Sequence, residues 1–484
     1  MTNHSKSKLT NGVLKALTIF GGVQVISIIC SVIRTKLIAI WIGAAGVGLF
    51  GIYNSAIELL NVIFNLGLRD SAVRDIAASK ESSISKLIII VRRWALILGI
   101  IGAIITVIIS PLLSNITFND NEHYWAFMAI AFIILLSSIQ NGELAILQGS
   151  KRLKQLAKAS IWGAIIGVLA SIPMFYFWKI DSVIPALITF SLATTIAILS
   201  QRVKNKEPRP SISLKSTLQS GRSFIILGTF LTVSAIVNHL ASYLFMSYLN
   251  HAGNTAIVGH YQAAFTLINK YMGIIFTAII MEYYPRLSQV SNSQMRTSTF
   301  VSHEMSIALW IILPVIAIFI AASQLIIEIL YSSEFLIITP FIIWGVIGTI
   351  FRAISWCMAF VILARGDGKI YLLTETLSAI TSITLNIIAY NHWGLNGLGI
   401  AYVLWYITYT IIIGCVYHYR YNLKLGKGTL QLITISSLIA LVCAISYFYI
   451  GWYVSAVIGI ILLPIAFYRL LLRKRSKQQA NSYH

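Results

Sequence analysis

The sequence is poor in charge, and above all in acidic charge. Only 11% of its 484 residues are charged, and Asp and Glu together number 15 against 36 Lys and Arg. Hydrophobic residues make up 57%, and the mean hydropathy is +0.82. Soluble domains carry about 25% charged residues, so this composition excludes a soluble globular protein. It predicts an all-α polytopic membrane protein.

Cysteine is also scarce. The four cysteines lie in apolar segments and lack the spacing of metal ligands; they are Cys30, Cys357, Cys415 and Cys443. Such residues are most simply small buried hydrophobic side chains. We therefore expect neither a metal nor another cofactor.

Three further absences narrow the function. No G-x-x-x-x-G-K-[ST] loop for ATP is present, so uphill transport would have to draw on an ion gradient or the membrane potential. No loop is long enough to fold as a soluble domain, which argues against a membrane glycan polymerase or ligase. The first apolar run is too long for a cleavable signal peptide and lacks a small-residue cleavage site. We expect a transporter rather than an enzyme.

The apolar runs predict fourteen membrane helices. They lie at about 13–40, 47–68, 87–111, 123–147, 159–178, 183–200, 223–249, 257–283, 303–326, 338–363, 370–391, 396–417, 429–449 and 453–471. We expect two pseudo-symmetric six-helix bundles followed by two C-terminal helices. The predicted segments are an N-terminal bundle (1–200), a cytoplasmic linker (201–222), a C-terminal bundle (223–418), two additional helices (429–471) and a basic cytoplasmic tail (472–484).

The basic residues follow the membrane topology. With the N-terminus inside, 31 of the 36 Lys and Arg fall in the tails, the inward loops or the adjoining helix ends. One, Lys179, falls in an outward loop. Outward loops instead carry Asp120, Glu122, Asp181 and Glu334. This distribution places both termini in the cytoplasm. The net charge of +21 therefore reflects topology, and we expect no nucleic-acid partner.

The remaining four cations lie inside predicted helices, where a charge is costly and usually functional. They are Arg34, Lys36, Lys270 and Arg352. Lys270 and Arg352 lie close to mid-span, and Lys270 is the best single candidate for binding an anion. For Arg34 two interpretations remain open, because its side chain could face a cavity or extend to the outer interface.

A polar stripe marks the second predicted helix. Its members, spaced 4, 3 and 4 residues apart, lie on one helical face: Asn54, Glu58, Asn61 and Asn65. Inside a membrane such a face contacts protein or water rather than lipid. Cations together with amide groups suit an anionic substrate that also carries many hydroxyls.

The same helix recurs later in the chain. Residues 51–61 align with 259–269, with Asn54 opposite Gln262. Five positions are identical: Gly51, Tyr53, Ala56, Leu59 and Asn61 match Gly259, Tyr261, Ala264, Leu267 and Asn269. Transporters built from internal repeats bind substrate between the repeats near the bilayer midplane. We therefore predict substrate contacts at Asn54, Asn61, Gln262 and Asn269, besides the four cations.

Two carboxylates are candidate coupling sites for H⁺ or Na⁺. Glu58 has no cation within one helical turn, so it needs a partner from another helix or a proton. Arg34 is the expected partner, and a purely structural ion pair is the alternative. Glu375 lies on a polar face with Ser378, Ser382 and Asn386. His239 is more often a hydrogen-bonded packing residue than a proton carrier, and both interpretations stay open.

Two short patterns carry a resemblance to a known family. They are Arg34-x4-Ala39-x3-Gly43, followed by Gly46, Gly48 and Leu49, and Gly67-Leu68-x3-Ala72-x-Arg74-x2-Ala77. This opening, residues 31–78, resembles that of the polysaccharide flippases of the MOP superfamily, particularly the Wzx-type O-antigen translocases. The helix layout resembles theirs over nearly the whole chain. The two additional C-terminal helices (429–471) exceed the usual twelve and resemble those of lipid II flippases.

The resemblance implies two bundles in a V-shaped, alternating-access arrangement. It implies transfer of an undecaprenyl-pyrophosphate-linked oligosaccharide, such as an O-antigen unit for lipopolysaccharide, across the bacterial inner membrane. It assigns a cavity role to Arg34, and it makes membrane lipids and the polysaccharide polymerase and chain-length proteins expected partners. The alternatives are a lipid II or teichuronic-acid flippase and a multidrug or cation antiporter of the same fold.

Overall fold

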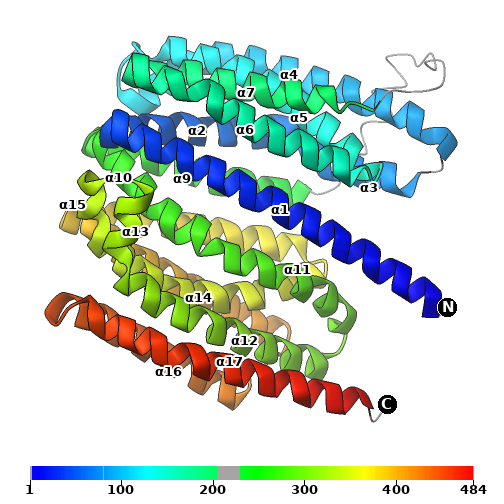
Figure 1. The fold of residues 1–484 in the computed structure, drawn as a ribbon, viewed down its shortest axis with the longest axis vertical. Helices are drawn as coiled ribbons and strands as arrows, with labels where there is room; N and C mark the ends of the chain where they lie inside the picture. Colours follow the sequence, from blue (N-terminus) through cyan, green and yellow to red (C-terminus); the bar gives the residue numbers. More distant parts are fainter. Residues whose placement is uncertain (1–2, 80, 204–228, 483–484) are drawn as a thin grey trace. The chain divides into compact units, whose positions relative to one another are not determined.

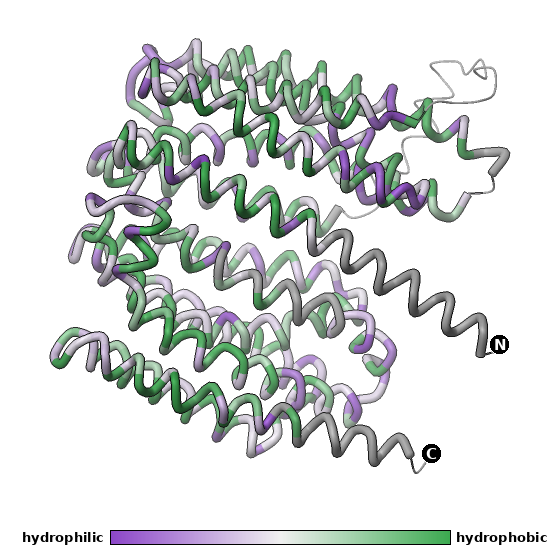
Figure 2. Tube along the Cα trace, in the orientation of Figure 1, coloured by the Kyte–Doolittle hydropathy of each residue, from purple (hydrophilic) through white to green (hydrophobic). Residues whose placement is uncertain are grey.

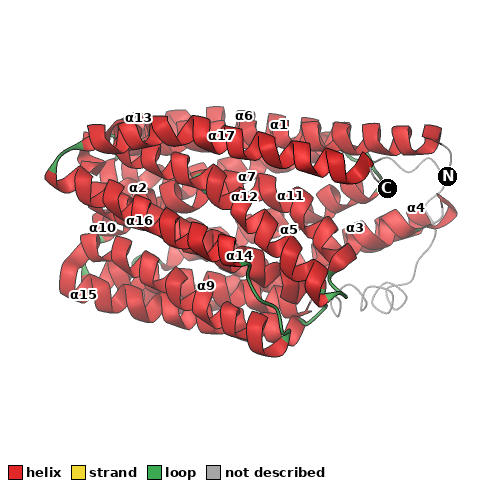
Figure 3. Cartoon of the chain, turned by 90° about the horizontal axis from the view of Figure 1, so that it is seen from below, coloured by secondary structure: helices red, strands yellow, loops and turns green. Residues whose placement is uncertain are grey.

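The computed structural model describes residues 3–79, 81–203 and 229–482, and within these ranges all regular structure is helical (Figure 3). The chain forms two compact units, Met1–Gly259 (unit 1) and His260–His484 (unit 2). Most of the predicted linker 201–222 lies outside the described residues. The grouping of residues 223–418 into a second bundle stays a prediction, since the helix after this linker packs within unit 1.

The described residues of unit 1 form seven long helices and one short one (Figure 1). They are α1 (Asn3–Trp41), α2 (Gly43–Asn65), α3 (Leu68–Ala78), α4 (Glu81–Phe118), α5 (Tyr124–Gly149), α6 (Leu153–Trp178), α7 (Val183–Ser200) and α9 (Thr229–Ala252), with the 3₁₀ turn η1 (Lys179–Ser182) before α7. The start of α10 (Thr255–Thr266) completes the unit. Helices α4 to α7 run side by side, and α1 packs on α6.

Small residues allow close helix packing in unit 1. A Cβ atom on Gly163 of α6 would lie 3.1 Å from the Thr194 Cα atom of α7, and one on Gly167 would lie 2.6 Å from the Phe190 ring. The approach of α2 to the start of α10 is closer still. A Cβ atom on Gly48 would lie 1.9 Å from the Thr255 carbonyl oxygen. Only glycine fits such a backbone contact.

Unit 2 begins within α10 and continues through a π-helical turn, η2 (Leu267–Tyr271). The following elements are α11 (Gly273–Val290), α12 (Gln294–Ala321), α13 (Ser323–Leu330), the 3₁₀ turn η3 (Ser333–Ile338), α14 (Thr339–Ala364), α15 (Gly368–Cys415), the π-turn η4 (Val416–Arg420), α16 (Lys427–Tyr449) and α17 (Trp452–Ser482).

Helix α14 forms the core of unit 2. It is mostly buried, and α15 packs along it, with Gly348 against the Tyr402 ring and Gly399 against the Phe341 backbone. The last two helices, α16 and α17, pack on α12. Gly459 of α17 meets Ile318 there. These two helices are therefore part of the folded body of unit 2.

The helices of the described residues are broadly consistent with the fourteen predicted. Eleven segments of the described residues are long and apolar enough to cross a membrane. Two of them hold two helices each, because Leu153–Ser200 is broken at η1 and Gly368–Arg420 at Gly394, whose φ is 57°. The path through α10, η2 and α11 adds one more. Figure 2 shows mainly hydrophobic colouring along the helices and hydrophilic residues concentrated at their ends.

Three local features differ from the sequence prediction. The short helices α3 and α13 were not expected, and the predicted helix 257–283 contains the π-turn η2. Helix α3 starts after two left-handed residues, Leu66 and Gly67, and buries Leu68, Ala72 and Ile76 at helical spacing. Its amphipathic pattern is too short to stand out among long apolar runs.

Candidate functional site

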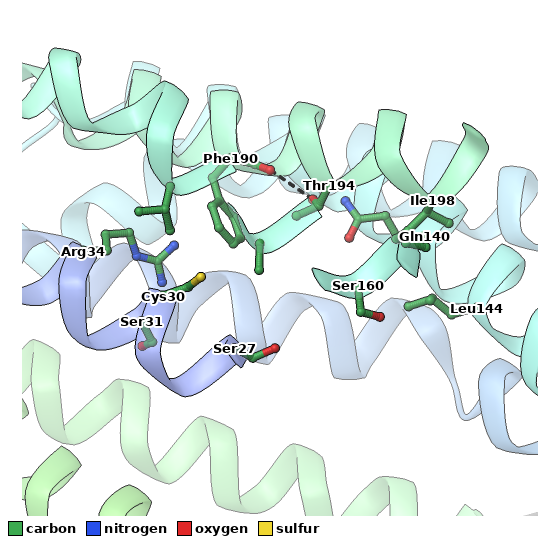
Figure 4. A pocket seen from close by; sticks show the side chains of 13 residues that line it. Ser27, Cys30, Ser31, Arg34, Gln140, Leu144, Ser160, Phe190, Thr194 and Ile198 are labelled. Carbon is green, nitrogen blue, oxygen red and sulfur yellow. Dashed lines mark hydrogen bonds between the residues drawn. The ribbon is translucent and has the colours of Figure 1, made fainter. Parts of the chain in front are cut away.

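Arg34 lies in a cavity inside unit 1 (Figure 4). Its guanidinium carbon lies 4.8 Å from the centre of the Phe50 ring and 4.6 Å from that of Phe190, so the cation is held between two aromatic faces. Its Nε atom is buried and has no hydrogen-bond partner, and no carboxylate of the described chain pairs with it. The charge is therefore available to an anion.

The rest of this cavity is neutral. It has a volume of about 240 Å³, and its polar lining comes from α1, α5, α6 and α7: Ser27, Ser31, Gln140, Ser160 and Thr194 (Figure 4). The Gln140 amide nitrogen donates to Thr195 Oγ1 at 2.8 Å and to the Ser191 carbonyl at 3.1 Å, which fixes its orientation. Lys36, two residues after Arg34, is partly buried on the same helix.

Glu58, in the polar stripe of α2, has a different partner from the one predicted. Asn54 Nδ2 donates to Glu58 Oε1 at 2.8 Å, and His239 Nδ1 of α9 lies 3.7 Å from Glu58 Oε2. The predicted pair between Glu58 and Arg34 is wrong. Arg34 is engaged by the rings of α2 and α7, whereas Glu58 faces α9.

Further along α2, Asn61 and Asn65 line a second cavity of about 290 Å³, together with residues of α3, α5 and α9. The side-chain oxygens of both asparagines are buried without a hydrogen-bond partner. Arg69 lies at the same cavity, and its guanidinium lies 3.5 Å from Gln148 Oε1. Burial lowers the pKa of Arg69. Unsatisfied amide oxygens are suited to accept hydrogen bonds from hydroxyl groups.

In unit 2, Arg352 of α14 is buried in a cage of aromatic rings. Its guanidinium carbon lies 4.6 Å from the centre of the Trp356 ring and 5.1 Å from that of Phe276. Nη1 donates to Asn269 Oδ1 at 2.8 Å, and the Tyr402 hydroxyl donates to the same oxygen at 3.0 Å. Nε has no partner, and among the described residues no carboxylate pairs with this cation.

Asn269 belongs to the π-turn η2, and so does Lys270. Such turns often mark functional positions in helices. Lys270 is exposed, while Asn269 is held by Arg352 and Tyr402. Gln262, which lies in the preceding helix α10, has a buried Oε1 atom without a hydrogen-bond partner. The two amides predicted from the repeat thus differ. The Asn269 oxygen accepts a hydrogen bond from Arg352, whereas the Gln262 oxygen has no hydrogen-bond partner.

Glu375 of α15 is partly buried and accepts a hydrogen bond of 2.5 Å from the Tyr409 hydroxyl. The predicted residues therefore form separate groups within each unit. In unit 1, Asn54 and Glu58 meet each other but not Arg34. In unit 2, Arg352 meets Asn269.

Sequence reasoning missed an ion-pair network around Glu143 of α5. This buried carboxylate accepts from Arg92 Nε at 2.7 Å and from Arg202 Nε at 2.8 Å, and Arg92 Nη2 also donates to the Val203 carbonyl at 3.0 Å. The network ties α4 and α5 to the residues that follow α7.

Replacing Glu143 by alanine should therefore destabilise unit 1, because Arg92 would be left partly buried without its carboxylate. Removing one member of a buried ion pair costs about 3 kcal/mol or more. Thermal or denaturant unfolding of the purified protein measures this loss. Glu122→Ala, at an exposed loop carboxylate, is the control and should change little. Equal stability of the two variants would show that the network is dispensable.

Comparison with known proteins places the sequence in a family. The family model described as polysaccharide biosynthesis protein matches residues 41–340. No curated protein sequence matches the chain.

Solved structures share the fold. The lipid II flippase MurJ in an inward closed conformation has a TM-score of 0.67 at 16% identity, with 95% of this chain and 100% of that chain covered. An inward-facing multidrug resistance MATE family transporter of the MOP superfamily scores 0.66 at 16% identity, covering 82% and 94%. A MOP superfamily transporter from Pyrococcus furiosus, whose reverse polarity of the binding pocket suggests a different function, scores 0.61 at 15% identity, covering 84% and 96%.

The fold is thus shared with the lipid II flippase MurJ and with MATE transporters. The matching family model spans well over half of the sequence. The chain therefore belongs to the polysaccharide biosynthesis protein family.

Proposed function

We propose that this protein is a flippase for an undecaprenyl-pyrophosphate-linked oligosaccharide, an O-antigen or similar surface polysaccharide unit. It moves the head group across the bacterial inner membrane by alternating access, with both chain termini in the cytoplasm. The observation that carries the proposal is the presence of two membrane-helix arginines, Arg34 and Arg352, that no carboxylate of the described chain neutralises.

Such cations fit a pyrophosphate. An unpaired guanidinium within a membrane segment is costly, and the cost is offset when an anionic ligand arrives. Arginine forms paired, charge-assisted hydrogen bonds with phosphate oxygens. Each of the two arginines retains a buried Nε donor without a partner. Lys36 on α1 and Lys270 on η2 supply further positive charge.

The amide groups fit the glycan. Asn61 and Gln262 have buried side-chain oxygens without hydrogen-bond partners, and sugar hydroxyls would donate to them. Asn54 and Asn269 lie beside the charged residues Glu58 and Arg352. The lipid tail stays in the bilayer during transfer. Proteins that polymerise the glycan or set its chain length are natural partners downstream.

Three other kinds of substrate share either this chemistry or this fold. Lipid II also presents a pyrophosphate, and the whole length of the lipid II flippase MurJ aligns with 95% of this chain. Teichuronic-acid precursors offer the same anion. Organic cations, as in a multidrug antiporter, are disfavoured because a cation cavity should be net acidic, whereas Arg34 and Arg352 have no carboxylate partner in the described residues.

Flipping in proteoliposomes tests the proposal. A fluorescent undecaprenyl-pyrophosphate oligosaccharide should become accessible in the opposite leaflet only when the protein is present. Lys270→Ala and Arg34→Ala should each lower the rate at least about tenfold, since a lost charge-assisted hydrogen bond costs roughly 1.5–3 kcal/mol. Lys86→Ala, at an exposed lysine of α4, is the matched control. Transport of the probe at wild-type rate by both variants would discard the cationic site, and absence of any transport would discard the substrate.

A further inference from the structure

Glu58 of α2 and His239 of α9 face each other across the contact between these helices. His239 Nδ1 lies 3.7 Å from Glu58 Oε2, and the other carboxylate oxygen accepts from Asn54 Nδ2 at 2.8 Å. Within the described residues, Glu58 and His239 make no other hydrogen bond or ion pair. Among the described residues, the carboxylate and the imidazole are therefore each other's only titratable contact.

The pair lies well inside two apolar helices. Glu58 is sixteenth of the 23 residues of α2, and His239 is eleventh of the 24 residues of α9. Their side chains are 53% and 36% exposed. A charged carboxylate at that depth cannot face lipid without a large cost. Its exposed part must face water, so protons have access to the pair.

We infer that Glu58 and His239 together form a proton-binding site that couples transport to a pH gradient. This inference rests on the proposed function and deepens it by naming the coupling ion. With neutral imidazole the pair has a charge of −1, and with one bound proton it is neutral. Neutrality is the state that a membrane interior favours.

The surroundings suit a proton better than Na⁺. A hard cation is bound by several oxygen ligands, whereas Glu58 is approached by an amide N–H group and an imidazole nitrogen. The described part of the chain holds no cluster of three or more His, Cys, Asp or Glu residues that could hold a metal ion. Proton binding needs only the two groups that are present.

Other charged and titratable groups lie on α2, on α9 and on the elements that pack against them, and several of these groups have partners of their own. Among the described residues they include Arg34 and Lys36 on α1, Lys86, Arg92 and Arg93 on α4, Glu143 on α5, Lys179 and Asp181 on η1, Tyr53 on α2, and Tyr243, Tyr248 and His251 on α9. Arg34 lies between two aromatic rings, and Glu143 binds Arg92. Tyr53 is hydrogen bonded to His123, and Tyr243 to Thr117. In the described part of the chain, none of these groups is hydrogen bonded or ion-paired to Glu58 or His239.

Protonation should strengthen the contact between α2 and α9. An imidazolium attracts the carboxylate, and its N–H group can donate to Oε2 with a small movement of either side chain. Loss of the proton leaves a single negative charge that attracts no neighbour on α9. The bound proton thus favours the state in which the two helices are close, which is how an ion gradient can bias a transport cycle.

A double-mutant cycle tests the site without any substrate. Glu58→Gln, His239→Gln and the double variant are unfolded thermally as full-length protein in lipid nanodiscs. At pH 5.5 the effects of the single substitutions should be non-additive, with a coupling of about threefold in the unfolding constant, as for partly exposed ion pairs. At pH 8.5 the coupling should vanish. Additive effects at both pH values would overturn the inference.

Transport gives the second test. In proteoliposomes carrying the fluorescent lipid-linked oligosaccharide, a pH gradient should speed flipping by the wild type. Glu58→Gln and His239→Gln should lose that stimulation, while Asp181→Asn and His251→Gln, at exposed positions, should keep it. Stimulation that persists in both site variants, or stimulation by a Na⁺ gradient alone, would overturn the proton site. A pH-dependent coupling in a protein that moves no oligosaccharide would uphold the site and reject the proposed substrate.

Discussion

Replacing Gly48 by alanine is expected to prevent unit 1 from reaching its native packing. The added Cβ atom would lie 1.9 Å from the Thr255 carbonyl oxygen and 2.8 Å from the Gly259 amide nitrogen. Both neighbours are backbone atoms, which cannot rotate away as a side chain can. Overpacking of a tight core costs about 1–3 kcal/mol and sometimes more, and here relief requires a whole helix to shift. We expect a loss of roughly 3 kcal/mol and little folded protein in the membrane.

Gly259→Ala provides the reciprocal variant, because its Cβ atom would lie 1.9 Å from the Ala44 carbonyl oxygen. Gly22→Ala is the matched control, since nothing lies within 4 Å of a Cβ atom built there. Yield after detergent extraction and the thermal unfolding midpoint measure the difference. Gly48→Ala or Gly259→Ala protein as stable as the Gly22→Ala control would mean that α2 and the start of α10 are not packed this closely.

The helices themselves follow from the sequence because a bilayer leaves little choice. Each span needs about 20 apolar residues with its backbone hydrogen bonds closed internally, and such runs stand out. Even the break between 391 and 396 was predicted, and Gly394 with its positive φ lies in it. The tight crossing also had a sequence signal. Ala44 and Gly48, and Thr255 and Gly259, are pairs of small residues four apart, a spacing typical of close helix contacts.

Side-chain partners were predictable only in part, since depth along a helix does not fix the direction in which a side chain points. Glu58 was expected to meet Arg34, and it meets His239 instead. Arg34 and Arg352 are held by aromatic rings and an amide, which are uncharged and give no pairing signal in a sequence rich in both. Glu143 pairs with Arg92, which lies at a similar depth on the neighbouring helix α4. The sequence alone did not indicate this pair.

Arg352→Met should separate stability from transport. Methionine has a similar length and suits the aromatic cage formed by Trp356, Phe276 and Tyr406. Since no carboxylate in the described chain pairs with Arg352, the substitution removes a buried charge without leaving an opposite charge unpaired. Replacing buried ionic groups by apolar side chains of similar volume is often neutral or stabilising, by about 1–4 kcal/mol. The unfolding midpoint should therefore stay level or rise.

Transport should respond in the opposite direction, because the proposed pyrophosphate site loses a cation. Flipping of the lipid-linked oligosaccharide is expected to fall at least about tenfold, the effect of one lost charge-assisted hydrogen bond. Tyr402→Phe is the control for the Asn269 hydrogen bond, because it removes the second donor to that amide oxygen and leaves the charge in place. Full transport by Arg352→Met would show that the cation does not contact substrate. A large loss of stability would instead assign Arg352 to the folding of unit 2, where its donation to Asn269 ties α14 to η2.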